Sequence, residues 1–236
     1  ALFKKLNFDP AGFAPSSFLP EQVDAFEVGL KAELLDRRVR FNGAGFYYDY
    51  TNIQLNHFVG AFPVIYNGKS AKVYGLDFDA EARVTNDLTL TGGLSLLHTE
   101  FGDFPISYTS LSGAIPLGDA TAKGKNLPNS PSYQINLGFD YVVHLGTGNV
   151  KLSASSFWSG KWYGQPENRV YQDAYNLLNA SLTWNFDNNE KYHVTVWGKN
   201  LGNTAYAAQL VTQGGIGDYV ALAPGRTFGA TVGVKF

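Results

Sequence analysis

The sequence predicts an all-β protein: an antiparallel transmembrane β-barrel, of which about nine strands lie in this chain. Three observations lead to this prediction. Nine segments alternate apolar with polar residues, the apolar positions carry no charge, and the connections between segments alternate between short and long. Because successive side chains of a strand point to opposite faces, each segment has one apolar and one polar face. A barrel wall between lipid and water has this pattern.

The first four strands form two predicted hairpins. They are expected at about 22–35, 39–57, 64–84 and 88–101. In the third, Leu76 and Phe78 alternate with Asp77 and Asp79, so the two faces differ in charge as well as in polarity. Short polar turns at 36–38 and 85–87 close the two hairpins, whereas the link at 58–63 between them is only modestly long.

The other five strands follow a long connection at 102–131, which is rich in Gly, Pro, Ser and Asn. They are expected at about 132–145, 149–162, 178–186, 191–205 and 228–236. The short turns 146–148 and 187–189 alternate with longer loops at 163–173 and 206–224. Loops of such length are usually exposed and often functional.

Charge and loop length together favour a membrane barrel over a soluble β-sandwich, which also alternates apolar and polar residues. The charged strand residues fall on the polar face: Glu27, Lys31, Glu33, Arg40, Asp77, Asp79, Glu81, Arg83, Asp140, Lys151, Lys199 and Lys235. A lipid-facing Arg or Lys near the bilayer midplane costs roughly 2–4 kcal/mol, so such positions are avoided. Outer-membrane barrels also have short turns on one side and long loops on the other.

Composition excludes several other classes. The chain has 236 residues, a formal net charge of −2 and no cysteine. We therefore expect no nucleic-acid partner, which would require a basic face, and no disulfide framework or thiolate metal site. The four histidines lie far apart, and no nucleophile stands beside a base, so the sequence predicts no enzyme, no metal site and no cofactor. The sequence contains no apolar run of about 18 residues, so it predicts no membrane-spanning helix.

Four motifs resemble the TonB-dependent outer-membrane receptors, specifically the C-terminal part of their β-barrel. They span nearly the whole chain in the family's order: Leu19-Pro20-Glu21 before Phe26-Glu27-Val28-Gly29-Leu30-Lys31, Tyr47-Tyr48-Asp49-Tyr50-Thr51-Asn52-Ile53-Gln54, Lys199-Asn200-Leu201-Gly202-Asn203, and Pro224-Gly225-Arg226-Thr227-Phe228. The third departs from the family pattern, because Gly202 and Asn203 replace the usual Phe-Asp. Each motif is degenerate alone, but their order makes the resemblance fairly specific.

The resemblance implies a barrel of 22 strands around a plug domain, located in the bacterial outer membrane and driven by the TonB complex. Residues 1–236 are then expected to be the C-terminal portion of the barrel, with the plug and the N-terminal strands absent from this chain. An open sheet in hydrocarbon would leave two unpaired edges, which supports this expectation. The resemblance also implies that Phe236 ends the last strand on the periplasmic side.

The expected function is TonB-dependent uptake of a scarce nutrient, a ferric siderophore being the leading candidate among the family's ligands, which also include haem, cobalamin and carbohydrates. A passive diffusion porin and a structural or adhesin barrel remain alternatives, and a soluble ligand-binding β-barrel is third. Expected partners are outer-membrane lipid, the rest of the barrel and the plug, the TonB complex and an unknown small ligand. Six residues in the external loops are the candidate ligand contacts: Tyr108, Trp162, Tyr163, Asn168, Arg169 and Tyr171.

Overall fold

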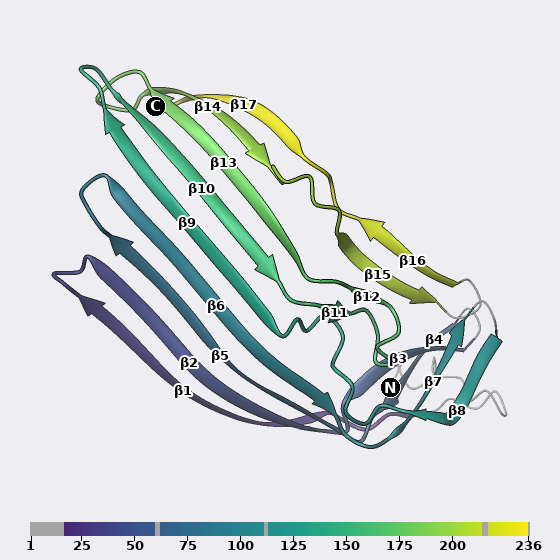
Figure 1. Cartoon of the computed structure of the whole chain (residues 1–236). Coiled ribbons are helices and arrows are strands. Elements are labelled where there is room, and N and C mark those ends of the chain that lie inside the picture. The colour runs from purple at the N-terminus through teal and green to yellow at the C-terminus, as the bar shows by residue number, and fades with distance from the viewer. Residues whose placement is uncertain (1–16, 60–61, 111–112, 214–216, 236) are drawn as a thin grey trace.

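Nine strands form one curved antiparallel sheet in the part of the chain that the structure describes (Figure 1). This computed structural model describes the backbone of residues 17–59, 62–110, 113–213 and 217–235, and their side chains except at 57–64, 107–120 and 212–217. The strands are β1 (Gln22–Leu34), β2 (Val39–Thr51), β5 (Ser70–Arg83), β6 (Leu88–Phe101), β9 (Tyr133–His144), β10 (Asn149–Ser159), β13 (Tyr175–Asn185), β14 (Tyr192–Lys199) and β17 (Thr227–Val234). They pair in this order, each with the next. The predicted meander of nine strands is therefore confirmed.

Within the described ranges there is no helix, and so none that could cross a membrane.

The second and third predicted strands are each shorter than expected. The sequence predicted strands at 39–57 and 64–84, but β2 ends at Thr51 and β5 begins at Ser70. Between them, β3 (Gln54–Val59) and β4 (Phe62–Asn67) form a separate hairpin. Asn52 adopts a left-handed conformation with φ 56°, and its N–H donates to the Lys69 carbonyl at 3.1 Å. This bend takes the chain out of the large sheet.

The other long connections also contain strands, which the sequence did not predict. They are β7 (Pro105–Ser110) with β8 (Gly113–Thr121), β11 (Trp162–Tyr163) with β12 (Tyr171–Gln172), and β15 (Ala207–Gln213) with β16 (Gly217–Leu222). Each of these pairs forms a small sheet of its own. All of them lie beyond the same end of the large sheet, which we call the hairpin end (Figure 1).

The apolar face of the sheet is exposed and is bounded by aromatic rows. Near the hairpin end, the register aligns Phe26, Tyr47, Tyr74 and His98 across four neighbouring strands. The Tyr47 and Tyr74 rings lie 6.2 Å apart, and the Tyr74 and His98 rings 4.6 Å apart. At the opposite end, Trp184 and Phe186 pack edge to face at 4.5 Å. Aromatic side chains favour the level where hydrocarbon meets headgroups.

The height of this apolar face fits a bilayer. On β5 and the residue that follows it, the apolar face runs from Tyr74 to Val84, about ten residues or roughly 34 Å of strand. A tilt of about 40° reduces this to roughly 26 Å along the membrane normal, close to the apolar band of about 25 Å in outer-membrane barrels. Just beyond the aromatic row of the hairpin end, the apolar side turns charged. This charged row is Asp24, Asp49, Lys72 and Glu100.

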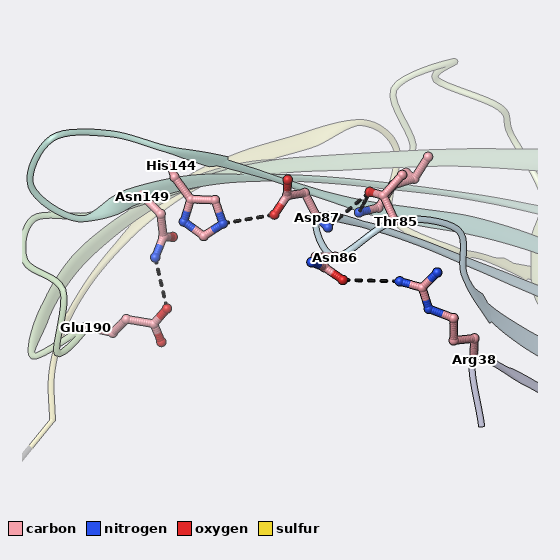
Figure 2. Close-up of polar contacts among 8 residues, drawn as sticks. Arg38, Thr85, Asn86, Asp87, His144, Asn149 and Glu190 are labelled. Atoms are coloured by element: carbon pink, nitrogen blue, oxygen red, sulfur yellow. Dashed lines mark hydrogen bonds and ion pairs between the residues drawn. The ribbon is translucent and has the colours of Figure 1, made fainter. Parts of the chain in front are cut away.

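The end of the large sheet opposite the hairpin end carries the short turns, and we call it the short-turn end. Polar side chains join neighbouring turns there (Figure 2). Arg38 donates to Asn86 at 3.2 Å, and the His144 ring contacts the Asp87 carboxylate at 2.9 Å. Asn149 donates to Glu190 at 3.0 Å. The chain also ends on this side, since the Lys235 N–H donates to the Lys191 carbonyl at 2.8 Å. Phe236 itself lies outside the described residues.

Candidate ligand-binding end of the sheet

An apolar cluster fixes two of the four long connections to the hairpin end. Its buried members come from β3, β5, β6, β7 and the residues just before β3, just before β7 and just after β8: Ile53, Leu55, Ala71, Phe101, Phe104, Ile106 and Ala122. The Phe101 and Phe104 rings pack edge to face at 5.6 Å. Because these side chains exclude water, β3 and β7 are held firmly against the ends of β5 and β6.

A second apolar cluster joins the other two connections. Trp162 of β11 packs with Ala207 and Leu210 of β15, and Val170 covers it. The Ala207 N–H donates to the side-chain oxygen of Gln172 at 2.7 Å. The base of the β15–β16 hairpin is thereby attached to the β11–β12 connection.

The segment between β11 and β12 lies at the centre of these connections and contacts its neighbours through polar groups. Asn168, left-handed at φ 54°, accepts a hydrogen bond from the Asn126 N–H at 2.7 Å and donates to the Asn126 carbonyl at 2.9 Å. Lys125 donates to the Glu167 carbonyl at 3.0 Å. Arg169 forms a bidentate ion pair with Asp218 of β16, in which the Arg169 Nη2 donates to the Asp218 Oδ1 at 2.9 Å. This segment therefore ties the β8–β9 connection to the β15–β16 hairpin.

Glu167 is an acid of this polar centre whose pKa is shifted by its surroundings. Burial raises the pKa of its carboxyl, a backbone hydrogen bond, Arg169 and Lys125 oppose this effect, and Asp218 adds slightly to it. Burial also raises the pKa of Tyr66 on β4, with a further contribution from Glu167. Tyr66 belongs to the connection between β2 and β5, so an electrostatic interaction relates Glu167 to that connection as well.

The charge of Glu167 should make the hairpin end sensitive to pH. An acid with a raised pKa in the folded state keeps its proton where the unfolded chain has already lost it, so folding is favoured as pH falls toward the ordinary value of 4.5 and opposed as pH rises. We expect Glu167→Gln to stabilise the hairpins of the hairpin end at neutral pH and to make their stability depend less on pH. Amide hydrogen exchange of residues 160–175 between pH 5 and 7.5 measures both effects.

Asp103→Asn is the control for this experiment, because Asp103 pairs with Lys123 at 3.9 Å while both side chains are largely exposed. Faster exchange in Glu167→Gln than in the unchanged protein at pH 7.5 would contradict the prediction.

The structure brings five of the six predicted ligand contacts into one connection. Trp162 is only 9% exposed and packs inside the second apolar cluster, and Asn168 is occupied by hydrogen bonds to Asn126. Both positions therefore serve the structure of the connection itself. Tyr108 belongs to β7, but its side chain lies outside the described part of the chain.

Tyr163 and Tyr171 form a more accessible surface. Their rings pack edge to face at 6.2 Å, and the Lys161 ammonium lies 3.4 Å from the centre of the Tyr171 ring. Tyr171 is 47% exposed. A cation held between two aromatic rings can attract an anionic or aromatic ligand. Ligand contact by these residues stays a prediction.

Sequence reasoning missed an aromatic group on the polar side of the sheet. Tyr175 stacks on Tyr206 at 4.8 Å and meets the edge of Phe157 at 6.0 Å. Phe157 and Tyr175 occupy polar-face positions at the ends of β10 and β13, so their departure from the polar pattern was the available signal. The contact with Tyr206 joins two separate segments and had no such signal.

The polar face below this group is hollowed. Its lining includes small hydroxyl and amide side chains and two charges: Thr91, Asp140, Ser153, Asn179, Ser181 and Lys199. Ser153 and Lys151 both bind Asp140, the latter at 3.1 Å. Among the described residues, no three His, Cys, Asp or Glu side chains are arranged to hold a metal ion. This face can offer hydrogen bonds to a polar occupant.

Comparisons with known proteins agree on one family. A family profile described as "TonB dependent receptor-like, beta-barrel" matches residues 4–201. The chain is 23% identical over 222 residues to the probable TonB-dependent siderophore receptor PiuA of Acinetobacter baumannii, covering 92% of this chain and 27% of that protein. It is 24% identical over 182 residues to the ferrichrome outer membrane transporter/phage receptor of Escherichia coli, covering 75% and 22%. The chain thus spans about a quarter of the length of these curated relatives.

Solved structures show the same fold. The ferric yersiniabactin uptake receptor FyuA of Yersinia pestis matches with a TM-score of 0.77 at 20% identity, over 95% of this chain and 32% of that one. The siderophore receptor PiuA of Acinetobacter baumannii matches with a TM-score of 0.68 at 22% identity, over 90% and 28%.

Proposed function

This chain belongs to the TonB-dependent receptor β-barrel family, and from that premise we propose that it is the C-terminal portion of an outer-membrane receptor that imports a ferric siderophore by TonB-dependent active transport. The family is one of transport receptors of the bacterial outer membrane. The observation that carries the proposal is the sheet itself, a nine-stranded meander with an apolar face of bilayer height and all its long hairpins at one end.

The rest of the barrel and the plug would complete this sheet. In the described part of the chain, the outer edges of β1 and β17 pair with no other strand. An unpaired backbone group in hydrocarbon costs several kcal/mol, so both edges require neighbours in a bilayer. We assign those neighbours to the N-terminal strands of the same receptor, and the polar occupant of the hollowed face to its plug domain.

The hairpin end is the proposed site of ligand capture. The accessible Tyr163–Tyr171 pair belongs to β11 and β12, and Tyr175 begins β13 (Figure 1). These strands meet at the hairpin end, opposite the short-turn end, and the family resemblance places the periplasm at the short-turn end. Aromatic rings and a cation suit an anionic iron chelate with planar groups. One relative is named as a probable siderophore receptor and another as a ferrichrome transporter, which supports the choice of ligand class.

Uptake of radioactive iron tests the proposal. Cells that carry the full receptor should accumulate iron from at least one of a panel of ferric catecholate, hydroxamate and citrate complexes, and should lose this uptake when TonB is deleted. Tyr171→Ala should weaken binding of the transported complex about tenfold, or about 1.4 kcal/mol.

Tyr192→Ala is the matched control, since Tyr192 is 48% exposed but lies at the short-turn end. Its binding should be unchanged once corrected for the amount of receptor. Entry of small solutes that persists without TonB would identify a passive porin instead, and binding of none of the iron complexes would exclude the siderophore class.

A further inference from the structure

The apolar face of β13, β14 and β17, which are neighbours in the large sheet (Figure 1), ends in aromatic side chains at the short-turn end. We call Trp184, Phe186 and Tyr192 the aromatic rim. They are 46%, 39% and 48% exposed. Aromatic rings of this kind favour the level where hydrocarbon meets lipid headgroups. The aromatic rim therefore marks the depth of the headgroups on this part of the wall.

Two lysines lie side by side at the aromatic rim. The Lys235 N–H donates to the Lys191 carbonyl at 2.8 Å, which places the two residues on adjacent strand ends. The Lys191 ammonium lies 5.6 Å from the centre of the Tyr192 ring, so it reaches the lipid-facing side. Among the described residues, neither lysine forms an ion pair. Two such cations at headgroup level are complementary to an anionic headgroup.

The two acids of the same turn bind other groups. Asp187 accepts hydrogen bonds from the N–H groups of Asn189 and Lys191 at 2.8 and 3.3 Å, so its carboxylate holds the backbone of the turn. Glu190 accepts a hydrogen bond from the side chain of Asn149 in the neighbouring turn at 3.0 Å (Figure 2). Both carboxylates therefore maintain the shape of the turns and do not pair with the lysine ammonium groups.

Further up the same three strands, the apolar face has a shallow hollow of about 290 Å³, which we call the lipid-side hollow. Ala180 and Gly198 are paired across β13 and β14 there. The larger side chains of Leu182, Val196 and Phe228 line the hollow around them. An acyl chain that enters this hollow gains dispersion contacts with its walls that a flat surface does not offer.

The spacing of the two features matches one lipid molecule. From Tyr192 to Gly198 β14 rises by about six residues, or roughly 20 Å of strand. A strand tilt of about 40° reduces this to roughly 15 Å along the membrane normal, about half of a hydrocarbon core of about 30 Å. A lipid with its phosphate at the aromatic rim therefore brings the end of its acyl chain to the lipid-side hollow.

We propose that β13, β14 and β17 hold one anionic glycerophospholipid of the periplasmic leaflet, with its phosphate between Lys191 and Lys235 and an acyl chain in the lipid-side hollow. The inference rests on the proposed function for its orientation, because the short-turn end is placed there at the periplasm. It assigns the two lysines as residues that select an anionic headgroup over a zwitterionic one, since only the latter carries its own cation.

Fluorescence quenching by brominated lipids tests this site without any transport step. The chain has no cysteine, so Val196→Cys beside the hollow can carry a small fluorophore in a full-length receptor with no other cysteine. The receptor is reconstituted in phosphatidylcholine vesicles with an equal, small fraction of brominated phosphatidylglycerol or brominated phosphatidylcholine. Phe139→Cys is the control position, because it lies on the apolar face of β9 as far from Val143 as Val196 lies from Tyr192.

At position 196 we expect phosphatidylglycerol to quench more strongly than phosphatidylcholine, and at position 139 we expect the two lipids to quench equally. Lys191→Gln should lower the enrichment of phosphatidylglycerol about fivefold. Lys191→Gln combined with Lys235→Gln should abolish the enrichment, whereas arginine at both positions should keep it. Lys123→Gln, which removes an exposed cation near Asp103 at the hairpin end, should leave it unchanged.

Equal quenching by the two lipids at position 196 overturns the proposal, as does a preference that persists in the variant with glutamine at both positions. A preference of the same size at position 139 also overturns it, because the attraction would then belong to the whole wall. Loss of iron uptake with an intact lipid preference would contradict the transport function but not this inference. Loss of the lipid preference with intact uptake would contradict this inference alone.

Discussion

Leu137→Arg is expected to destabilise the folded barrel by roughly 2–4 kcal/mol, because it places a cation on the lipid-facing side near the bilayer midplane. Leu137 is 52% exposed and lies on the apolar face of β9. That face runs from Tyr133 to Val143, so Leu137 is close to its middle. An arginine there could reach the headgroups only by distorting the strand or thinning the bilayer.

Reversible unfolding of the full receptor in lipid vesicles, titrated with guanidinium chloride, measures this cost. Asn136→Arg is the control, because the neighbouring side chain points to the polar face at nearly the same depth. It should cost far less than Leu137→Arg. Equal losses in the two variants would mean that the face assigned to lipid does not contact hydrocarbon.

Gly148→Ala should be the most damaging change in the short turns. Gly148 has φ 77°, and a Cβ added to it would lie 2.0 Å from the backbone oxygen of Asn185. The left-handed conformation alone costs a residue other than glycine about 1–3 kcal/mol. The contact with Asn185 is with backbone, so the added methyl can be accommodated only if β13 moves away. That movement would break the bond from the Gly148 N–H to Asn188, which measures 2.9 Å.

Gly146→Ala in the same turn separates this effect from a general sensitivity of the turn. A Cβ at Gly146 meets nothing within 4 Å. We expect Gly146→Ala to unfold at nearly the denaturant concentration of the unchanged protein, and Gly148→Ala at a clearly lower one. If both variants unfold together, the backbone conformation assigned to Gly148 is wrong.

Most of the large sheet could be predicted because its strands follow a strict two-residue period and its short turns interrupt that period with polar residues. The bend between β2 and β3 could not, since alternation continues on both sides of it. Only Asn52, with its left-handed backbone, and Gly68 distinguish the position. A Cβ at Gly68 would lie 2.7 Å from the Phe104 ring, a neighbour far away in the sequence. A tertiary contact with Phe104 therefore requires glycine at position 68.

The hairpin end was predictable in place but not in detail. The loop at 163–173 was correctly expected to lie at the hairpin end, yet periodicity could not separate Trp162, which packs between hairpins, from Tyr171, which is exposed. The partner of Arg169 was also beyond reach, because Asp218 is 49 residues away and joins it only after both hairpins have formed. Charge pairing between separate loops has no local pattern.

The order of the strands bears on how this protein assembles. Each strand of the large sheet pairs with the next strand in the order of the sheet, so no pairing has to span more than the connection between two neighbouring strands. The long external connections fold back into hairpins of their own, and each doubling of a connection's length adds only about 0.6 kcal/mol of closure entropy. The large sheet can therefore form by adding one strand at a time at either edge. New sequence can accumulate in the hairpins of the hairpin end during evolution with little penalty for assembly.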